Sequence, residues 1–148
     1  MPTPMSALRT YDYAIVRVVP RVERGEFINA GVILSCAASG LLQARIELDE
    51  WRLLALDPFV DLAGIRAGLA AIPVICAGGA VAGALGALSL RERFHWLVAP
   101  RSTAIQTSPV HTGRCTSPED QLEQLMRTMV RRPSPRPDAP FAPAPTKG

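Results

Sequence analysis

The residues best suited to chemistry are concentrated in the segment 101–112. Within twelve residues it carries guanidinium, imidazole, amide and hydroxyl groups: Arg101, Ser102, Thr103, Gln106, Thr107, Ser108, His111 and Thr112. The planar fork of arginine matches a phosphate or a carboxylate, and hydroxyl and backbone N–H groups can complete a donor shell around an anion. The segment therefore predicts a polar surface that binds a small anionic ligand or a partner protein.

Three polar residues from the N-terminal part of the chain join this candidate site if they pack nearby: Arg17, Arg21 and Asn29. The alternative is a structural role, in which the hydroxyl and amide groups satisfy loop backbone atoms. In that case Arg101 pairs with Glu26 or Asp12.

An enzymatic alternative rests on the histidines, because imidazole is the natural acid or base near neutral pH. The chain has two, His95 and His111. His111 with Arg101 as an oxyanion stabiliser describes a small hydrolase or transferase, although no carboxylate has a spacing that would orient the imidazole. His95 lies between two aromatic residues and is predicted to be a hydrogen-bonded core residue.

Cofactor and metal sites have no support in the spacing of residues. The three cysteines, Cys36, Cys76 and Cys115, are far apart and form no C-x-x-C pair, which argues against a zinc site or a disulfide framework and favours a reducing compartment. We expect them to be core residues without a catalytic role. No Walker or G-x-G-x-x-G pattern is present, so we expect no nucleotide cofactor and no metal.

The distribution of charge argues against nucleic-acid binding. The chain of 148 residues has a formal net charge of +3. Residues 1–130 hold 12 arginines and 12 acids, whereas residues 131–148 hold four basic residues and one acid. The body is therefore neutral and presents no broad basic footprint, so a nucleic-acid-binding module ranks third among the functional hypotheses.

A membrane location is also not expected. The uncharged stretch from Ala67 to Leu90 is 24 residues long, but it contains five glycines and Pro73, so it predicts buried, glycine-broken structure. The first ten residues lack the apolar region of a secretory signal. We therefore expect a cytoplasmic protein.

Hydrophobic patterning predicts strands at 13–19, 27–36 and 42–48, with the third strand near an edge because its residues alternate between apolar and polar. The first two strands form a predicted hairpin, and a short β segment is predicted at 105–107.

Helix caps predict the remaining elements. Asp49 precedes a short helix at 51–56, and Asp57 followed by Pro58 predicts the start of a longer helix, with Phe59 on its apolar stripe and Pro73 ending or kinking it. Ser89 and Glu92 form a capping box that favours a helix over a strand at 94–98. A last helix begins at Ser117, with an apolar stripe of Leu122, Leu125, Met126 and Met129.

These elements predict an α+β fold in which a small antiparallel sheet from the N-terminal half is covered by helices. The predicted organisation is a flexible N-terminus at 1–10, a single domain at 11–130 and a disordered tail rich in proline and arginine at 131–148.

Three blocks of sequence carry a resemblance to a known family. They are YDYAIVRVVP at 11–20, EFINAGVIL at 26–34, and RFHWLVAPRST with QTSPVHTG within 93–113. Over residues 11–130 the chain resembles an uncharacterised bacterial family, domain of unknown function 3037. The resemblance implies a small cytoplasmic protein without an assigned activity, often encoded beside a HipA-like kinase, and it supplies no catalytic residues. Residues 62–90 are richer in Ala and Gly than the family pattern, so packing or a partner surface differs there.

The leading functional prediction is a non-catalytic accessory module. It recognises a partner protein or a small anionic ligand through the 101–112 surface, and the resemblance alone names a HipA-like kinase as that partner. The alternatives are the His111 and Arg101 enzyme and the nucleic-acid-binding module.

Overall fold

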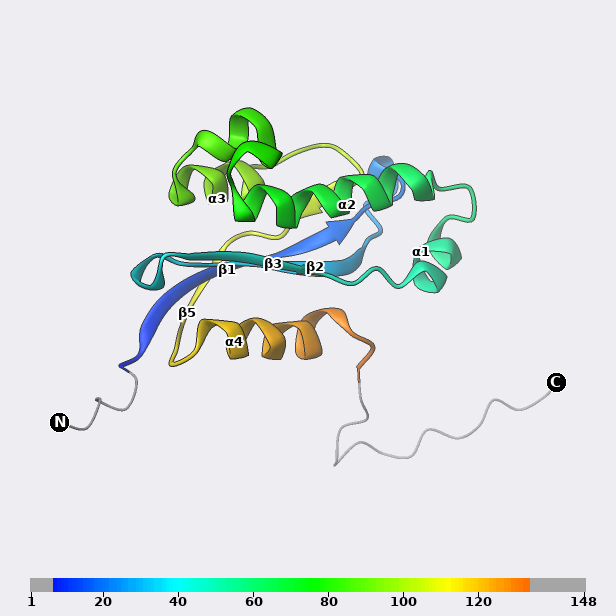
Figure 1. The fold of residues 1–148 in the computed structure, drawn as a ribbon. Coiled ribbons are helices and arrows are strands. Elements are labelled where there is room, and N and C mark those ends of the chain that lie inside the picture. The colour runs from blue at the N-terminus through cyan, green and yellow to red at the C-terminus, as the bar shows by residue number, and fades with distance from the viewer. Residues whose placement is uncertain (1–6, 134–148) are drawn as a thin grey trace, which may run out of the picture.

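The computed structural model describes residues 7–133 as three layers, with helices on both faces of a five-stranded sheet (Figure 1). The predicted α+β fold with an antiparallel sheet is confirmed. The first strand begins at Arg9, inside the range that was assigned to a flexible N-terminus. Residues 1–6 of that range, and residues 134–148 of the predicted tail, lie outside the described residues.

The sheet is organised around its first strand. The strands are β1 (Arg9–Val18), β2 (Ile28–Cys36), β3 (Leu41–Ile46), β4 (Ile105–Thr107) and β5 (His111–Cys115). β2 pairs with one side of β1, and β3 follows β2 as an edge strand, as predicted. β4 and β5 pair with the other side of β1, at its two ends. The sequence predicted β4 but not β5, because β5 reads as a polar loop.

A bulge in β2 determines which side chains face each helical layer. Val16 pairs with Gly31 whereas Arg17 pairs with Asn29, so Ala30 is one extra residue in β2. The extra residue reverses the alternation of β2, and both faces of the strand carry buried residues. Burial on both faces explains why the first two predicted strands read as almost continuous apolar runs.

One face of the sheet is covered by α2 (Leu62–Ala77) and α3 (Leu90–Val98), while α1 (Glu50–Leu56) lies at its end (Figure 1). The predicted caps of α1 and α3 are confirmed: Arg52 N–H donates to Asp49 at 3.2 Å, and Glu92 N–H donates to Ser89 at 3.2 Å. The second cap establishes that the segment after Ser89 is a helix.

The predicted start of the long helix is wrong. Asp61 caps α2, accepting a hydrogen bond from Gly64 N–H at 3.0 Å, because Asp57 instead ends α1. Phe59 therefore lies in the connecting loop, 86% exposed, and not on the apolar stripe. The helix also does not end at Pro73 but continues to Ala77.

The glycine-broken stretch is only partly buried, contrary to expectation. After α2 the chain forms a 3-10 segment, η3 (Ala80–Ala87), which has no buried residue, and Val81 is 88% exposed. Among residues 7–133, no single helix is long and apolar enough to cross a membrane, and α2 with η3 passes that test only as a pair bent by 66°. His95 is also exposed, because Phe94 and Leu97 are the α3 residues that face the core.

The other face is covered by α4 (Pro118–Leu125), which continues as a wider turn, η4 (Met126–Val130). Ser117 caps α4 as predicted. Met126 is fully buried, whereas Met129 is half-exposed and does not belong to the core stripe.

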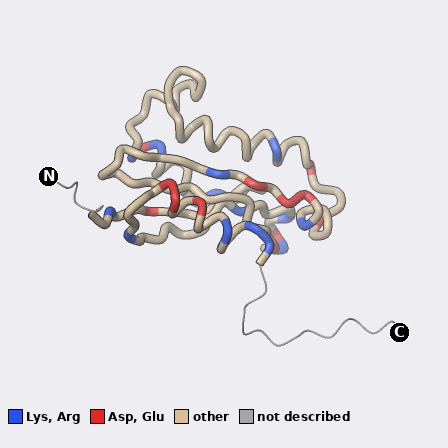
Figure 2. Tube along the Cα trace, turned by 60° about the horizontal axis from the view of Figure 1, so that its bottom comes forward, with Lys and Arg blue, Asp and Glu red and all other residues tan. Residues whose placement is uncertain are grey.

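Ion pairs hold the end of this helical segment in place. Arg131 pairs with Glu47 at 2.8 Å and with Glu123 at 2.6 Å, and Arg132 pairs with Asp49 at 2.9 Å. In Figure 2 basic residues at the end of the described chain lie beside acidic ones. Residues 131 and 132, which were assigned to the tail, therefore contact the folded domain.

Candidate functional site

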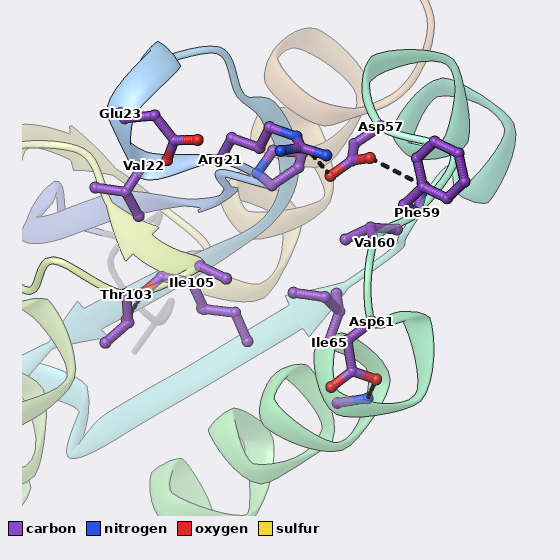
Figure 3. A pocket seen from close by; sticks show the side chains of 13 residues that line it. Arg21, Val22, Glu23, Asp57, Phe59, Val60, Asp61, Ile65, Thr103 and Ile105 are labelled. Carbon is purple, nitrogen blue, oxygen red and sulfur yellow. Dashed lines mark hydrogen bonds and ion pairs between the residues drawn. The ribbon is translucent and has the colours of Figure 1, made fainter.

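A large hollow with a volume of about 690 Å³ lies between three segments. These are the turn η1 (Val22–Arg24), the region from the end of α1 to the start of α2, and residues 103–105 (Figure 3). We call it the large hollow. Its walls are mixed, with Val22, Phe59 and Ile105 contributing apolar surface.

Asp57 organises one side of the large hollow. Its side chain is almost completely buried, accepts a hydrogen bond from Phe59 N–H at 2.9 Å and lies 3.2 Å from Arg21 Nε (Figure 3). A buried carboxylate is stable in a protein only when it is paired and hydrogen-bonded, and both conditions are met here. The result is that the loop after α1 is held in one conformation, with the ring of Phe59 exposed at the rim.

The charge of the large hollow is acidic. It is lined by one guanidinium, that of Arg21, and by three carboxylates, those of Glu23, Asp57 and Asp61. Asp61 also caps α2 and has Gly64 beside it, where a Cβ would lie 2.3 Å from a carboxylate oxygen. Because Arg21 already pairs with Asp57, the remaining negative charge of the large hollow favours a cationic group over an anion. The large hollow thus does not have the charge expected of the predicted anion site.

A second, smaller hollow of about 150 Å³ lies between α2, α3 and residues 99–107. We call it the small hollow. The Arg101 guanidinium lies 4.1 Å from the centre of the Trp96 ring and donates to Trp96 O at 2.5 Å. Gln106 donates to Thr103 O at 3.0 Å, and Thr103 donates to Ile105 O at 2.8 Å. The small hollow therefore brings together Arg101, Thr103, Gln106 and Thr107 of the 101–112 segment, and the Thr107 hydroxyl donates to Val98 O at 3.4 Å.

The other predicted residues of the 101–112 segment make separate contacts. Ser108 is buried and joins β4 to β5: its hydroxyl accepts from Ile15 N–H at 2.8 Å and donates to Pro109 O at 2.9 Å. The Thr112 hydroxyl donates to Asp12 at 2.6 Å. Ser102 is exposed.

The two remaining hairpin residues lie away from both hollows. Asn29 donates to Met129 O at 2.9 Å, which places it on the α4 face. Arg17, its partner in the sheet register, lies 4.3 Å over the ring of Phe27. The structure thus divides the predicted site between the large hollow, the small hollow and the α4 face.

The structure does not bring together His111 and Arg101, the two residues of the predicted enzymatic site. His111 packs against Tyr13 with ring centres 5.3 Å apart, whereas Arg101 packs against Trp96. His111 lines neither hollow. Arg101 also pairs with neither Asp12 nor Glu26, since Glu26 pairs with Arg24.

Nucleophile and metal chemistry also lack a site in the part of the chain that the structure describes. All three cysteines are buried, and burial raises the pKa of the Cys76 thiol to about 12 and that of Cys115 above its ordinary value. Burial therefore keeps these two thiols protonated near neutral pH. Residues 7–133 contain no cluster of three or more His, Cys, Asp or Glu side chains that could hold a metal ion.

The sequence reasoning missed the residues that shape the large hollow. Val22 and Glu23 were not among the predicted site residues, and Phe59 was predicted to lie on a helix stripe. One sequence signal was available: Asp61 is as suitable a helix N-cap as Asp57, and it would have predicted a later start of the helix.

Comparison with known proteins supports the predicted family. The sequence pattern of a family described as "Protein of unknown function (DUF3037)" matches residues 13–130. No curated protein and no solved structure matches the chain. Because the family match extends over most of the chain, from the first strand to the last helical turn, the chain belongs to the DUF3037 family of proteins of unknown function.

Proposed function

We propose that this protein is a non-catalytic binding module that accepts a segment of a partner protein in the large hollow. The observation that carries the proposal is the position of Phe59, whose ring is 86% exposed at the rim while its backbone is held by the buried Asp57. Aromatic side chains held in place at the surface are typical anchors of protein interfaces.

The composition of the large hollow supports a protein partner. Val22 is 45% exposed and lines the same space, together with Val60 and Ile65. An apolar centre with a polar rim is the usual anatomy of a protein interface. The excess of carboxylates favours a partner segment that combines apolar residues with a basic side chain.

The same residues favour binding over catalysis. In the part of the chain that the structure describes, no histidine or cysteine lines the large hollow, and Thr103, which supplies its hydroxyl group, donates to Ile105 O. Two of its three carboxylates are engaged, that of Asp57 by Arg21 and that of Asp61 by the start of α2. A HipA-like kinase, which the family resemblance implies, is the first candidate partner to test.

Site-specific photo-cross-linking tests this proposal. A photoreactive phenylalanine analogue replaces Phe59 in one variant and Val81 in a control, because Val81 is equally exposed but lines no hollow described here. We expect a defined protein adduct from position 59 and none from position 81. The purified partner should then bind Phe59→Ala about 10-fold to 100-fold more weakly than the wild type.

Unchanged affinity of Phe59→Ala would contradict the proposal, as would equal cross-linking from both positions. Val81→Ala should bind like the wild type. Both side chains are exposed, so neither substitution should lower the melting temperature, and a loss of binding cannot then be assigned to unfolding.

A further inference from the structure

We propose that the small hollow is a second binding site, which takes a compact apolar carboxylate such as an alicyclic or short aliphatic acid. The apolar body of the ligand occupies the space between α2 and α3, and its carboxylate binds the Arg101 guanidinium. This site is independent of the partner proposed for the large hollow.

The floor of the small hollow is apolar. Ile72, Ile75 and Leu97 line it and are almost completely buried. Small residues on the facing elements, Ala71 on α2 and Ala99 after α3, leave the space open. A volume of about 150 Å³ corresponds to roughly five water molecules at about 30 Å³ each, which suits one small ring or a short chain.

Arg101 supplies a positioned charge at this apolar space. Its stacking on Trp96 and its hydrogen bond to Trp96 O hold the guanidinium in place, and this bond uses one of its five N–H donors. No acidic residue within the described range 7–133 forms an ion pair with it. A guanidinium that is already ordered loses little conformational freedom when it binds a carboxylate.

The surroundings select a monocarboxylate over more highly charged anions. Among residues 7–133, Arg101 is the only charged residue that lines the small hollow, and Thr103, Gln106 and Thr107 add neutral polar groups. A phosphate dianion needs further cationic or N–H donors, and its body would leave the apolar floor unused. A cation is disfavoured by the charge of Arg101.

Fluorescence of Trp96 provides a direct readout. The chain has two tryptophans, and Trp51 is 82% exposed and lines neither hollow, so Trp51→Phe in the full chain leaves Trp96 as the single reporter. The probe is cyclohexanecarboxylate, and the neutral control is cyclohexanemethanol, which has the same ring. We expect saturable binding of the acid and at least tenfold weaker binding of the alcohol.

Three variants on this background test the role of each part of the site. Arg101→Gln should weaken acid binding at least tenfold, because it removes the charged donor. Ala71→Leu should also abolish or strongly weaken binding, because the larger side chain fills the space. Arg114→Gln is the matched control: Arg114 is exposed on β5, lines neither hollow and should leave the affinity unchanged.

The proposal is overturned if the acid shows no saturable binding, if the alcohol binds as tightly as the acid, or if Arg114→Gln weakens binding as much as Arg101→Gln. It is also overturned if a peptide with a C-terminal leucine binds in an Arg101-dependent manner while the free acid does not. If Arg101→Gln unfolds the protein, as judged by circular dichroism, Arg101→Lys and Ala71→Leu decide the outcome. None of these results depends on the large hollow.

Discussion

The two faces of the sheet carry helical layers with different properties. On the α4 face Tyr11, Leu122, Leu125 and Met126 are all almost completely buried. Ion pairs of Arg131 hold the end of this layer, where Val130 and Arg131 line a polar hollow of about 250 Å³. The face under α2 and α3 has a larger core, but the large hollow and the small hollow open at its margins. The comparison teaches that the two layers bury their cores in different ways, and both binding sites proposed above lie at the margins of the α2 and α3 layer.

The small side chains of α2 explain part of this difference. Gly68 and Ala71 line the small hollow, and residues of this size cannot fill the space between α2 and α3. At Gly68 an added Cβ would lie 2.5 Å from Ile105 Cδ1, so a larger residue there would displace the end of the Ile105 side chain. The Ala- and Gly-rich composition of residues 62–90 thus has a local structural consequence.

The largest expected effect separates the two layers directly. Leu122→Ala removes a fully buried side chain of the α4 layer and should lower the free energy of unfolding by about 2–5 kcal/mol. Ile105→Ala should cost less, about 1–2 kcal/mol, because Ile105 is half-buried and already borders both hollows. Urea denaturation measures both values. Equal losses would show that the two layers are packed equally well.

A second substitution tests how closely β5 approaches β1 on the α4 face. A Cβ at Gly113 would lie 2.6 Å from the Tyr11 hydroxyl oxygen and 2.7 Å from the ring carbon that carries it. Because Tyr11 is buried, its ring cannot move freely, and Gly113→Ala should lower the free energy of unfolding by about 1–3 kcal/mol.

The double variant Gly113→Ala with Tyr11→Ala separates this collision from other effects. It should destabilise the protein by less than the two single changes added together. Strict additivity would mean that Tyr11 does not cause the effect.

The smallest effect concerns the ion pairs that hold the end of the α4 layer. Hydrogen bonds from Arg131 lower the pKa values of Glu47 and Glu123 below their ordinary value of 4.5. A lowered carboxyl pKa stabilises the folded state above the unfolded-state value, and this contribution is lost as the pH falls through the lower folded-state value. The wild type should therefore lose stability as the pH falls from about 5 toward about 3.

Arg131→Gln should reduce this loss, because without the guanidinium the two carboxyl groups titrate closer to their ordinary pKa. Urea denaturation at several pH values gives the comparison. Arg91→Gln, at an exposed arginine on α3, is the control and should show the same pH dependence as the wild type. If Arg131→Gln retains the full pH dependence, other carboxylates are responsible for it.

Local signals predicted most of the elements. The caps at Asp49, Ser89 and Ser117 are correct because a cap hydrogen bond joins residues three apart in the sequence. The start of α2 was predicted at the wrong residue because Asp57 and Asp61 are both acceptable helix caps. In the folded protein Asp57 pairs with Arg21, which is distant in the sequence, and Asp61 caps the helix.

Predictions that depended on which way a side chain points were less reliable. His95 was expected in the core, but Phe94 and Leu97 are the α3 residues that pack against the core, and His95 is exposed. The 101–112 segment was expected to form one surface, but β4 and β5 pair with opposite ends of β1, which separates Arg101 from His111.

The amino-acid sequence alone determined the family, the α+β class and the positions of most helices and strands, because these follow from patterns between neighbouring residues. The tertiary structure decided which polar residues meet. Ion pairs and hollows are formed by residues far apart in the sequence, such as Arg21 with Asp57 and Ala71 with Arg101. These contacts depend on how the helices and the sheet pack as layers.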